Sequence, residues 1–324
     1  MISDLPKSIG LTFSGFYRAS KVRHCTATNG TPFVALSLED LSGIIKAYAW
    51  LDRYQGDQRI TDFDRIWVKG RLRFMDGEWR TDLLEGHIVQ EVTENPVQLL
   101  PKRLCKIPDA LQSLHDSIEK LTNEPLRRFV FNALSTDDIA LPFIAVPASM
   151  RHHHSYRGGL LEHTLECMQM VRSLTEPGGD MQELGIVAAL FHDIGKIKIY
   201  TEWGRRTRAG YVLHHDALTV ELLAPFLSQL DRDWHDGAIS LRYLWSWRQA
   251  AKFSSRPLMT LADAVTLADR MSCTKNAELL AFKGQPEWKR FAKISDDSCF
   301  WRPKPFTTGI DGFEGIPEFV EKQR

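Results

Sequence analysis

The first third of the chain alternates apolar and polar residues in short runs that turn-forming residues separate. Turns are indicated at Asn29-Gly30 and Asp76-Gly77, because asparagine or aspartate before glycine favours a tight hairpin. Five short antiparallel strands in such a span are typical of a small β-barrel of the OB-fold class. The pattern predicts strands at about Thr12–Thr26, Phe33–Glu39, Ile44–Leu51, Arg65–Phe74 and Trp79–Gln90.

Two of these strands carry cations and aromatic rings at alternate positions. Since successive side chains of a strand point to opposite faces, the cations and rings of each strand share one face. Such a face is suited to single-stranded nucleic acid, in which rings stack on bases and cations lie near phosphates. The alternative is a solvated outer face on which long side chains cover exposed rings. The candidate nucleic-acid-binding residues are Lys46, Tyr48, Trp50, Arg65, Trp67, Lys69, Arg71 and Arg73.

A change of periodicity marks a second domain. Residues 93–108 contain three prolines and little periodicity, which is typical of a linker. From Asp109 onward apolar residues recur at helical spacing, so this part is predicted to be all-α and the whole chain α+β. We expect an OB-fold at 1–92, the linker at 93–108, a helical domain at 109–285 and a C-terminal tail at 286–324. Within the helical domain, later helices are expected at about 159–174, 183–194, 216–230, 236–252 and 257–272.

Histidines gather at the start of one predicted helix. The stretch RHHHSYRGGLLEHTLE, residues 151–166, contains four of the eleven histidines. Its glycine pair, Gly158-Gly159, indicates a turn before the helix that carries His163. A lone histidine in a helix is usually structural, so His163 acquires meaning only through partners elsewhere in the chain.

His192 and Asp193 are such partners, because they close an apolar helix and offer a nitrogen and a carboxylate at one point. Gly195 is the expected C-terminal stop of that helix. Mixed imidazole and carboxylate ligation suits Mn²⁺, Fe²⁺, Zn²⁺ or Ni²⁺ more than Ca²⁺. His163 and an aspartate of the helix near 257–272, which carries Asp263 and Asp269, are the natural further ligands.

These residues carry a resemblance to a known family. The order H…HD…D resembles the HD phosphohydrolase superfamily, which is all-helical, metal-dependent and cleaves phosphoesters. The HDxGK form at residues 192–196 is specific. The strings FIAVPASMRHHHSYRGGLLEHTL and NGTPFVALSLEDLSGIIKAYAW together resemble the YhaM-type 3′–5′ exoribonucleases, which join an OB-fold to an HD domain. The resemblance covers about residues 10–275 and leaves the tail unexplained.

The resemblance implies a set of site residues. His214 falls where the family has a further histidine, with His215 as an alternative in register, and Lys196 could contact a substrate phosphate. His153 and His154 match a histidine pair ahead of the glycines, and His152 is extra. With an ordinary pKa of about 6.5, the pair would be partly charged near neutral pH and could neutralise phosphate together with Arg157. The implied metal ligands are His163, His192, Asp193, His214 and Asp269; the implied catalytic residues are His192, Asp193, Lys196, His153, His154 and Arg157.

One departure from the family concerns a histidine pair expected between His214 and Asp269. The region here reads AISLRYLWSWRQAAKF and has no histidine. The second metal is then held differently, the site is mononuclear, or catalysis has been lost. The HD-containing relaxases of conjugative elements share the three-histidine stretch and the HDxGK motif, and they accommodate this aromatic region at least as well.

Composition limits the remaining possibilities. The formal net charge is zero, so a nucleic-acid partner would need a local basic surface. Five scattered cysteines and the absence of a long apolar run or a signal-like start indicate a cytoplasmic protein with no membrane partner. The sequence therefore predicts a metal-dependent phosphodiesterase acting on single-stranded RNA or DNA, most simply a 3′–5′ exoribonuclease, with Mn²⁺ as the first expectation. The alternatives are a relaxase-like DNA-processing protein and a non-catalytic nucleic-acid-binding protein; a homo-oligomer is compatible with either activity.

Overall fold

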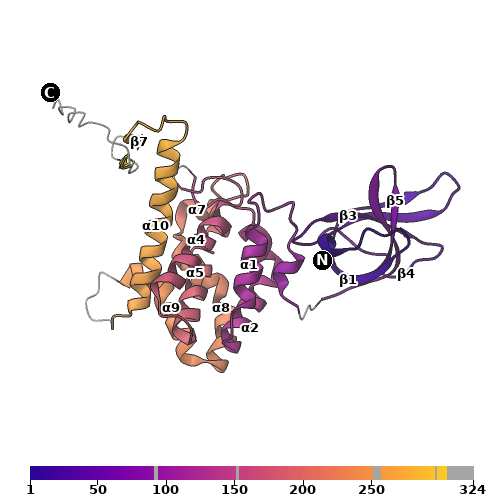
Figure 1. Ribbon diagram of the computed structural model, residues 1–324. Helices are drawn as coiled ribbons and strands as arrows, with labels where there is room; N and C mark the ends of the chain where they lie inside the picture. Colours follow the sequence, from indigo (N-terminus) through magenta and orange to yellow (C-terminus); the bar gives the residue numbers. More distant parts are fainter. Residues whose placement is uncertain (91–93, 151–152, 251–256, 296–297, 305–324) are drawn as a thin grey trace. The chain divides into compact units, whose positions relative to one another are not determined.

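The structure is a computed structural model (Figure 1) that describes residues 1–304 apart from 91–93, 151–152, 251–256 and 296–297. The chain divides into two compact units, Met1–Lys275 and Asn276–Arg324. The first unit contains both the predicted barrel and nearly all of the predicted helical domain. The fold is α+β, as the sequence predicts.

The strands of the N-terminal third close into a barrel. Neighbouring strands follow the order β3-β2-β1-β5-β6-β4, and an additional parallel pairing of β3 with β6 closes the sheet. The inward positions are apolar and fully buried, as at Leu38, Ile66 and Val68, which is the half-buried alternation that the sequence displays. The five predicted strands are confirmed; the sixth, β4, is too short to show alternation. The strands are β1 (Thr12–Thr26), β2 (Pro32–Glu39), β3 (Ile44–Trp50), β4 (Gln55–Gly56), β5 (Arg65–Met75) and β6 (Glu78–Ile88).

The remainder of the first unit is helical and has its own apolar core. Leu114, Phe129, Leu160 and Phe191 are among its buried residues. Asparagine caps begin two short elements, because Asn95 accepts a hydrogen bond from Val97 N and Asn123 accepts one from Leu126 N. The helices are α1 (Ala110–Glu119), α2 (Glu124–Leu134), α3 (Asp137–Phe143), α4 (Gly159–Leu174), α5 (Asp180–Phe191), α6 (Lys196–Ile199), α7 (Arg208–Val212), α8 (His215–Asp233), α9 (His235–Ala250) and α10 (Thr260–Phe282).

The region predicted as a linker packs against this core. A 3₁₀ helix covers Pro96–Leu99, and Val97, Leu99 and Leu100 are at most 3% exposed. Val97 and Leu100 join the apolar core of the helical part, together with Leu41 from the barrel. Residues 95–100 are therefore a packed element, which prolines alone do not distinguish from a free linker.

A buried arginine connects the barrel with the helices inside the first unit. Arg18 of β1 is 2% exposed and donates to Leu99 O at 2.9 Å and to Phe63 O at 2.9 Å. Its guanidinium also forms an ion pair with Asp137 at the start of α3, with an N–O distance of 2.9 Å. Arg65 of β5 pairs with the same carboxylate at 2.7 Å. Because every branch of Arg18 has an acceptor, burying this charge is tolerable.

The second unit contributes a small hairpin. Strand β7 (Phe291–Ser295) pairs antiparallel with β8 (Ser298–Trp301). The predicted C-terminal tail begins before this hairpin, and its residues 305–324 lie outside the part of the chain that the structure describes.

Candidate metal centre

Four ligand-type side chains converge from three helical elements. His163 lies one turn into α4, His192 and Asp193 follow the end of α5, and Asp269 lies on α10. One ligand atom from each of the four lies within 4.8 Å of all the others. The helices bring them together because α5 is buried over nearly its whole length between its neighbours, which fixes where its C-terminal end emerges.

The cluster is buried and its closest atoms carry lone pairs. His163 Nε2 lies 3.1 Å from His192 Nε2, 3.3 Å from Asp193 Oδ2 and 3.3 Å from Asp269 Oδ1. The side chain of His163 is 0% exposed and those of Asp193 and Asp269 are 5% and 12% exposed. Two carboxylates and two imidazoles therefore meet with little access to water.

The proton positions on the two rings follow from their other hydrogen bonds. His192 Nδ1 lies 2.7 Å from Ala189 O, a carbonyl that only accepts, so His192 carries its proton on Nδ1. His163 Nδ1 lies 2.9 Å from Ser272 Oγ, and Ser272 donates its own proton to Glu166 Oε2 at 2.6 Å. His163 must then donate from Nδ1 as well.

Both Nε2 atoms consequently present lone pairs to one another, beside two carboxylates. That arrangement is repulsive by itself and favourable around a cation. The donor set of two neutral imidazoles and two carboxylates fits Mn²⁺, Fe²⁺, Zn²⁺ or Ni²⁺. The four residues therefore fit a divalent metal, as the sequence predicts.

The chain from Glu166 through Ser272 to His163 is a feature that sequence reasoning missed. Ser272 is 0% exposed and lies one helical turn after Asp269. Burial by itself would raise the pKa of Glu166, but hydrogen bonds from His154, Lys275 and Ser272 lower it to about 2. The Glu166 carboxylate is thus an acceptor, and it fixes the serine hydroxyl that orients the His163 ring.

Asp193 is held as a carboxylate by its neighbours. Burial would raise its pKa, but the Lys196 ammonium, the strongest of the opposing interactions, holds the pKa well below its usual value. Lys196 Nζ lies 2.5 Å from Asp193 Oδ2. Lys196, predicted as a phosphate contact, thus stands beside the carboxylate that faces the His163–His192 pair.

Gly195 has a different function from the one expected. It is not a left-handed helix stop, since its φ is −57°. A Cβ at this position would lie 2.1 Å from His215 O, so the glycine permits the start of α8 to approach the turn after Asp193. The approach brings His215 Nε2 to 3.1 Å from Asp193 Oδ1, whereas His163 contacts the other oxygen, Oδ2.

His214 lies outside this cluster, and the alternative in register, His215, lies beside it. The side chain of His214 is 64% exposed and its Nδ1 is 3.2 Å from Asp216. His215 is 20% exposed and contacts both Asp193 and Asp216. At the start of a helix, side chains of adjacent residues point in directions about 100° apart. Motif spacing alone therefore cannot tell which of the two histidines faces the cluster.

The region that lacks the family's histidine pair lines the same site with apolar side chains. Trp245 is 4% exposed and donates from Nε1 to Ala188 O at 3.0 Å. A cavity of about 30 Å³, the room of one water molecule, remains beside the cluster. It is lined by His192, Asp193, His215, Asp216, Leu244, Trp245, Val265, Thr266 and Asp269.

His153 faces the centre as a neutral ring. Its ring centroid lies 5.5 Å from that of His163, and its buried Nε2 has no hydrogen-bond partner among the described residues. Burial first, and then the nearby Lys196 charge, lowers the pKa of His153 to about 4. The expectation of a partly charged His153 near neutral pH does not hold in this environment.

His154 has the contacts of a structural residue. It is 1% exposed and adopts a left-handed φ of +46°. Its Nδ1 lies 3.0 Å from Tyr156 Oη and its Nε2 lies 3.3 Å from Ser272 Oγ. Its carbonyl oxygen would lie 2.1 Å from a Cβ at Gly159, so this glycine allows the loop to fold onto α4. His152 lies outside the described residues.

Arg157 lies in a different set of contacts from the cluster. Its guanidinium forms an ion pair with Glu202 at 2.6 Å and lies over the Trp203 ring at 5.3 Å from the centroid. It therefore holds the segment that follows α6, and its role as a direct phosphate ligand stays a prediction.

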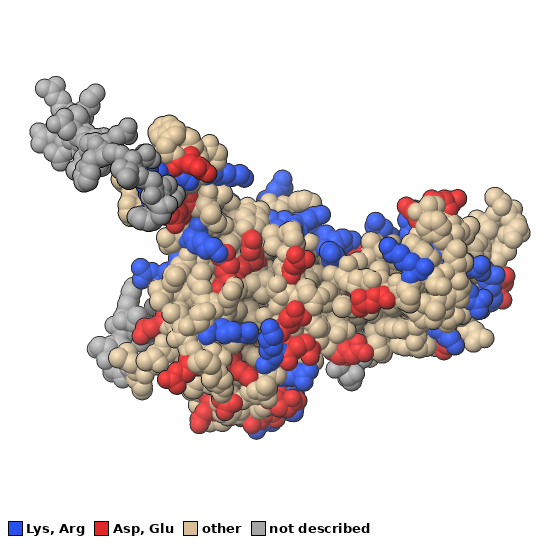
Figure 2. Space-filling view, in the orientation of Figure 1, with Lys and Arg blue, Asp and Glu red and all other residues tan. Residues whose placement is uncertain are grey.

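The outer face of the barrel carries the predicted stripe, but β6 supplies acids between its cations. Strand β6 lies between β3 and β5, and Asp82 is opposite both Tyr48 and Arg71. Lys46 pairs with Glu78 at 2.5 Å and Arg73 pairs with Asp82 at 3.0 Å. Figure 2 shows basic and acidic side chains interspersed over the visible surface.

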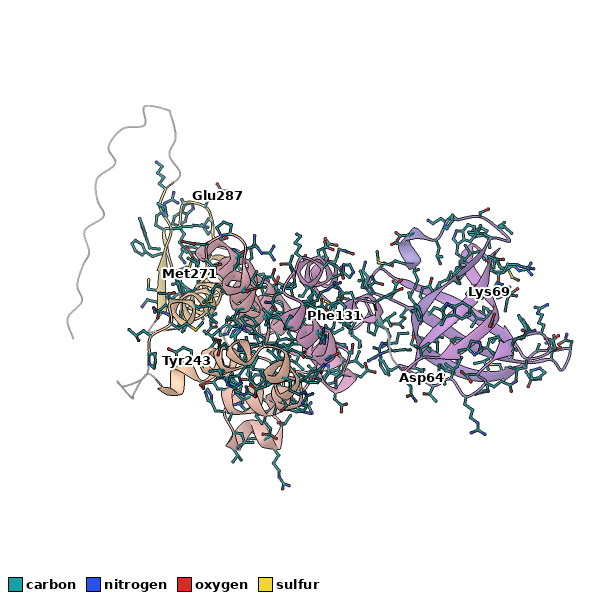
Figure 3. All side chains as sticks on the ribbon, turned by 90° about the horizontal axis from the view of Figure 1, so that it is seen from below. Asp64, Lys69, Phe131, Tyr243, Met271 and Glu287 are labelled. Carbon is teal, nitrogen blue, oxygen red and sulfur yellow. The ribbon has the colours of Figure 1, made fainter. Side chains whose placement is uncertain are left out.

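Three cations of the stripe are thus neutralised and two are not. Arg65 is 14% exposed and pairs with Asp137, so it is a contact to the helices. Lys69 and Arg71 are exposed and, among the described residues, have no ion pair; Figure 3 labels Lys69 on the barrel. Trp67 stacks on His87 with ring centroids 6.2 Å apart, and Trp50 packs on Phe33 at 4.8 Å.

Within the helical part, residues 160–274 match the HD domain family. Over most of its length the chain is similar to proteins named 3′-5′ exoribonuclease YhaM. The one from Oceanobacillus iheyensis is 25% identical over 311 residues, covering 92% of this chain and 96% of that protein. The one from Halalkalibacterium halodurans is 22% identical, covering 91% and 94%, and the one from Listeria monocytogenes serotype 4b is 23% identical, covering 78% and 82%. The resemblance inferred from the motifs is confirmed.

One further finding concerns membranes. In the described part of the chain, every helix is too short or too polar to cross a bilayer.

Proposed function

We propose that this chain is a metal-dependent 3′–5′ exoribonuclease that acts on single-stranded RNA in the cytoplasm. The observation that carries the proposal is the pair of Nε2 lone pairs, on His163 and His192, that face each other between two carboxylates. Such a site within an HD domain supports phosphoester hydrolysis. The substrate class and polarity rest on the names of the relatives that align over most of the chain.

The metal would be held by His163, His192, Asp193 and Asp269, and Mn²⁺ is our first expectation. When bound, a divalent ion lowers the pKa of a water molecule and polarises the phosphate. His215, next to the second oxygen of Asp193, is the candidate ligand for a second ion in place of His214. With Leu244 and Trp245 lining that side, a second ion would find fewer ligands than the first.

Other residues would act on the substrate directly. Lys196 offers an ammonium beside Asp193 and could donate to a phosphate oxygen. His153 offers a buried, unpartnered Nε2 toward the same site. Because its ring is neutral, it would contribute a hydrogen bond to phosphate or to the attacking water, and not a positive charge.

The barrel would bind the part of the RNA strand that lies at a distance from the cleaved bond. Lys69 and Arg71 are the cations of the stripe that lack an acidic partner among the described residues, and Trp67, Tyr48 and Trp50 offer ring faces. Rings that stack on bases and cations that follow phosphates give affinity without sequence preference. Lys46 and Arg73 remain weaker candidates because neighbouring acids already neutralise them.

The test uses the metal-free chain reconstituted separately with Mn²⁺, Fe²⁺, Zn²⁺ and Ni²⁺. Single-stranded RNA and DNA of one sequence, labelled at the 5′ end, are followed on a denaturing gel. A ladder that shortens progressively from the 3′ end of RNA supports the proposal. Cuts at internal sites contradict the exonuclease assignment, and faster cleavage of DNA favours the DNA-processing alternative.

A chain that binds metal and RNA but cleaves neither substrate would establish the non-catalytic alternative. The apolar side chains in place of the family's histidine pair are the observation that keeps this alternative in view.

A further inference from the structure

The segment that connects the two sides of the metal centre has an unusual composition. Residues 196–213, the basic aromatic segment, begin directly after Asp193 and Gly195 and end directly before His214 and His215. The segment contains five basic and one acidic side chain, a formal net charge of +4 in a chain whose net charge is zero. Neither the predicted ligands nor the predicted stripe accounts for it.

The segment is ordered by its own backbone contacts. Tyr200 and Arg206 form an isolated antiparallel bridge, and Thr201 N donates to Arg205 O at 2.9 Å. Thr207 then caps α7 by accepting a hydrogen bond from Gly210 N. A Cβ at Gly210 would lie 2.5 Å from Ile199 O, so α7 packs directly on α6. The segment is therefore a folded element whose two ends adjoin the residues of the metal centre.

Two rings and three arginines of the segment face solvent, and these arginines lack acidic partners among the described residues. Trp203 and Tyr211 are 72% and 74% exposed. Arg205, Arg206 and Arg208 are exposed and, in the part of the chain that the structure describes, none has an ion pair. The single acidic residue of the segment, Glu202, forms an ion pair with Arg157, which lies outside the segment, at 2.6 Å. The positive charge of the segment is thus available to a ligand.

Rings and guanidinium groups alternate along this surface. Arg157 lies over Trp203 at 5.3 Å, and Arg206 lies over Tyr211 at 5.9 Å from the ring centroid. Apolar side chains that are exposed together on one surface, unlike single exposed ones, mark binding sites. Exposed rings between unpaired cations match the alternating bases and phosphates of single-stranded nucleic acid.

We propose that the basic aromatic segment binds the 3′-terminal nucleotides of single-stranded RNA and delivers them to the metal centre, with bases stacked on Trp203 and Tyr211 and phosphates near Arg205, Arg206 and Arg208. The assignment of the 3′ end rests on the proposed function. Both ends of the segment join residues of the centre, so nucleotides held here lie next to the bond to be cut. The barrel would then hold a more distant part of the strand.

The experiment measures binding in the absence of metal, so that cleavage plays no part. The full-length chain is stripped of metal and titrated into fluorescein-labelled single-stranded RNA at several KCl concentrations. We expect Trp203→Ala combined with Tyr211→Ala to weaken binding by at least about tenfold, as base stacking contributes roughly that much per ring. Arg205→Ala, Arg206→Ala and Arg208→Ala together should reduce the slope of log K against log salt by about 2, because each lost phosphate contact removes about 0.7.

Matched control variants remove a tryptophan or an arginine outside the basic aromatic segment. Trp288→Ala deletes a tryptophan that is 75% exposed, and Arg232→Ala deletes an exposed arginine without an ion pair in the described chain. Both should bind RNA like the wild type. If the segment variants bind with wild-type affinity and salt slope, or if the metal-free chain does not bind RNA, the inference is wrong.

A second measurement locates the strand without altering the protein. RNA carrying 4-thiouridine at the 3′-terminal position, or at one ten nucleotides upstream, is photo-crosslinked to the wild-type chain and the crosslinked peptide is identified. We expect the terminal probe within residues 196–213 and the upstream probe outside it. The reverse pattern overturns the inference. Failure of the proposed function appears separately, as wild-type chain that binds RNA in this way but does not shorten it when metal is added.

Discussion

The outer face of the barrel and the region around the metal centre are both rich in cations and rings, but their charges are arranged differently. On the barrel, Lys46 and Arg73 each face an acid of the adjacent strand. At the centre, lone pairs and carboxylates converge, and Lys196 is the neutralising cation among the described residues. The arginines at 205, 206 and 208 in the segment beside the centre have no acidic partner in the described part of the chain. Residue types are therefore a poor guide to binding until the neighbouring charges are known.

The largest effect is expected from breaking the centre itself. Asp193→Ala should abolish bound metal and lower any metal-dependent hydrolysis by at least about a thousandfold, since a metal supplies several kcal/mol to such a reaction. Asp263→Ala is the matched control, because Asp263 lies on the same helix as Asp269 but is exposed. Metal content by plasma mass spectrometry and helicity by circular dichroism check both variants. Full metal occupancy in Asp193→Ala would disprove the ligand assignment.

A smaller effect is expected from disturbing the group that orients His163. Ser272→Ala leaves His163 Nδ1 without its acceptor and should weaken metal affinity by about tenfold to a hundredfold, as observed when outer-shell partners of metal ligands are removed. Ser228→Ala, an exposed serine on α8, is the control. Competition with a chelating dye gives the affinity, and the melting temperature of the metal-free chain separates positioning from stability. Equal affinities for wild type and Ser272→Ala would contradict the role assigned to the hydroxyl.

The ion pairs that join the barrel to the helices should contribute to the free energy of unfolding and leave metal affinity unchanged. Burial alone would raise the pKa of Asp137, but the Arg18 and Arg65 guanidinium groups outweigh it and hold the pKa below its usual value. Asp137→Asn should cost about 1–2 kcal/mol at pH 7, near the lower end for hydrogen bonds to charged groups. The estimate is discounted because the carboxylate is 39% exposed and solvent screens it.

The pH dependence of this difference has a definite sign. A carboxyl whose pKa is lower in the folded chain stabilises it fully above the unfolded-state pKa of about 3.9 and progressively less as pH falls through the folded-state value. The gap between wild type and Asp137→Asn in urea unfolding should be constant from about pH 5 to 8 and close below about pH 4. A gap that widens toward low pH would show that Asp137 is not stabilised as a carboxylate.

The smallest effect should come from the neutralised cations of the barrel. Lys69→Ala with Arg71→Ala should lower the salt slope of RNA binding by about 1.4, the value for two phosphate contacts on a single strand. Lys46→Ala with Arg73→Ala removes the same formal charge but should leave the slope nearly unchanged, because Glu78 and Asp82 already neutralise these cations. Equal slopes for the two pairs would remove the distinction between the free and the neutralised cations of the barrel.

Much of the fold is predictable because it depends on periodicity. The strand alternation gives the bounds of β1 without error and places the other long strands within two residues. It does not give the parallel pairing of β3 with β6, which joins segments far apart in the chain. The glycine pair correctly marks the start of α4, where Gly158 adopts a φ of +83°.

The site was less predictable where its geometry depends on residues that are distant in the sequence. The motif predicts His163, His192, Asp193 and Asp269, and the structure brings those four together. It does not distinguish His215 from His214, because that choice depends on how closely α8 approaches Gly195. Ser272 and Glu166 carry no motif, and the neutral state of His153 follows from burial that a sequence does not display.

The contact between Asp193 and His215 closes the intervening chain into a loop whose two ends meet at 3.1 Å. The free energy needed to close such a loop grows only with the logarithm of its length, about 0.6 kcal/mol for each doubling. Residues can therefore be added or exchanged at the tip near Trp203 without displacing the ligands at either end. Changes at this tip could therefore alter which RNA the segment would bind without changing the residues proposed to carry out hydrolysis.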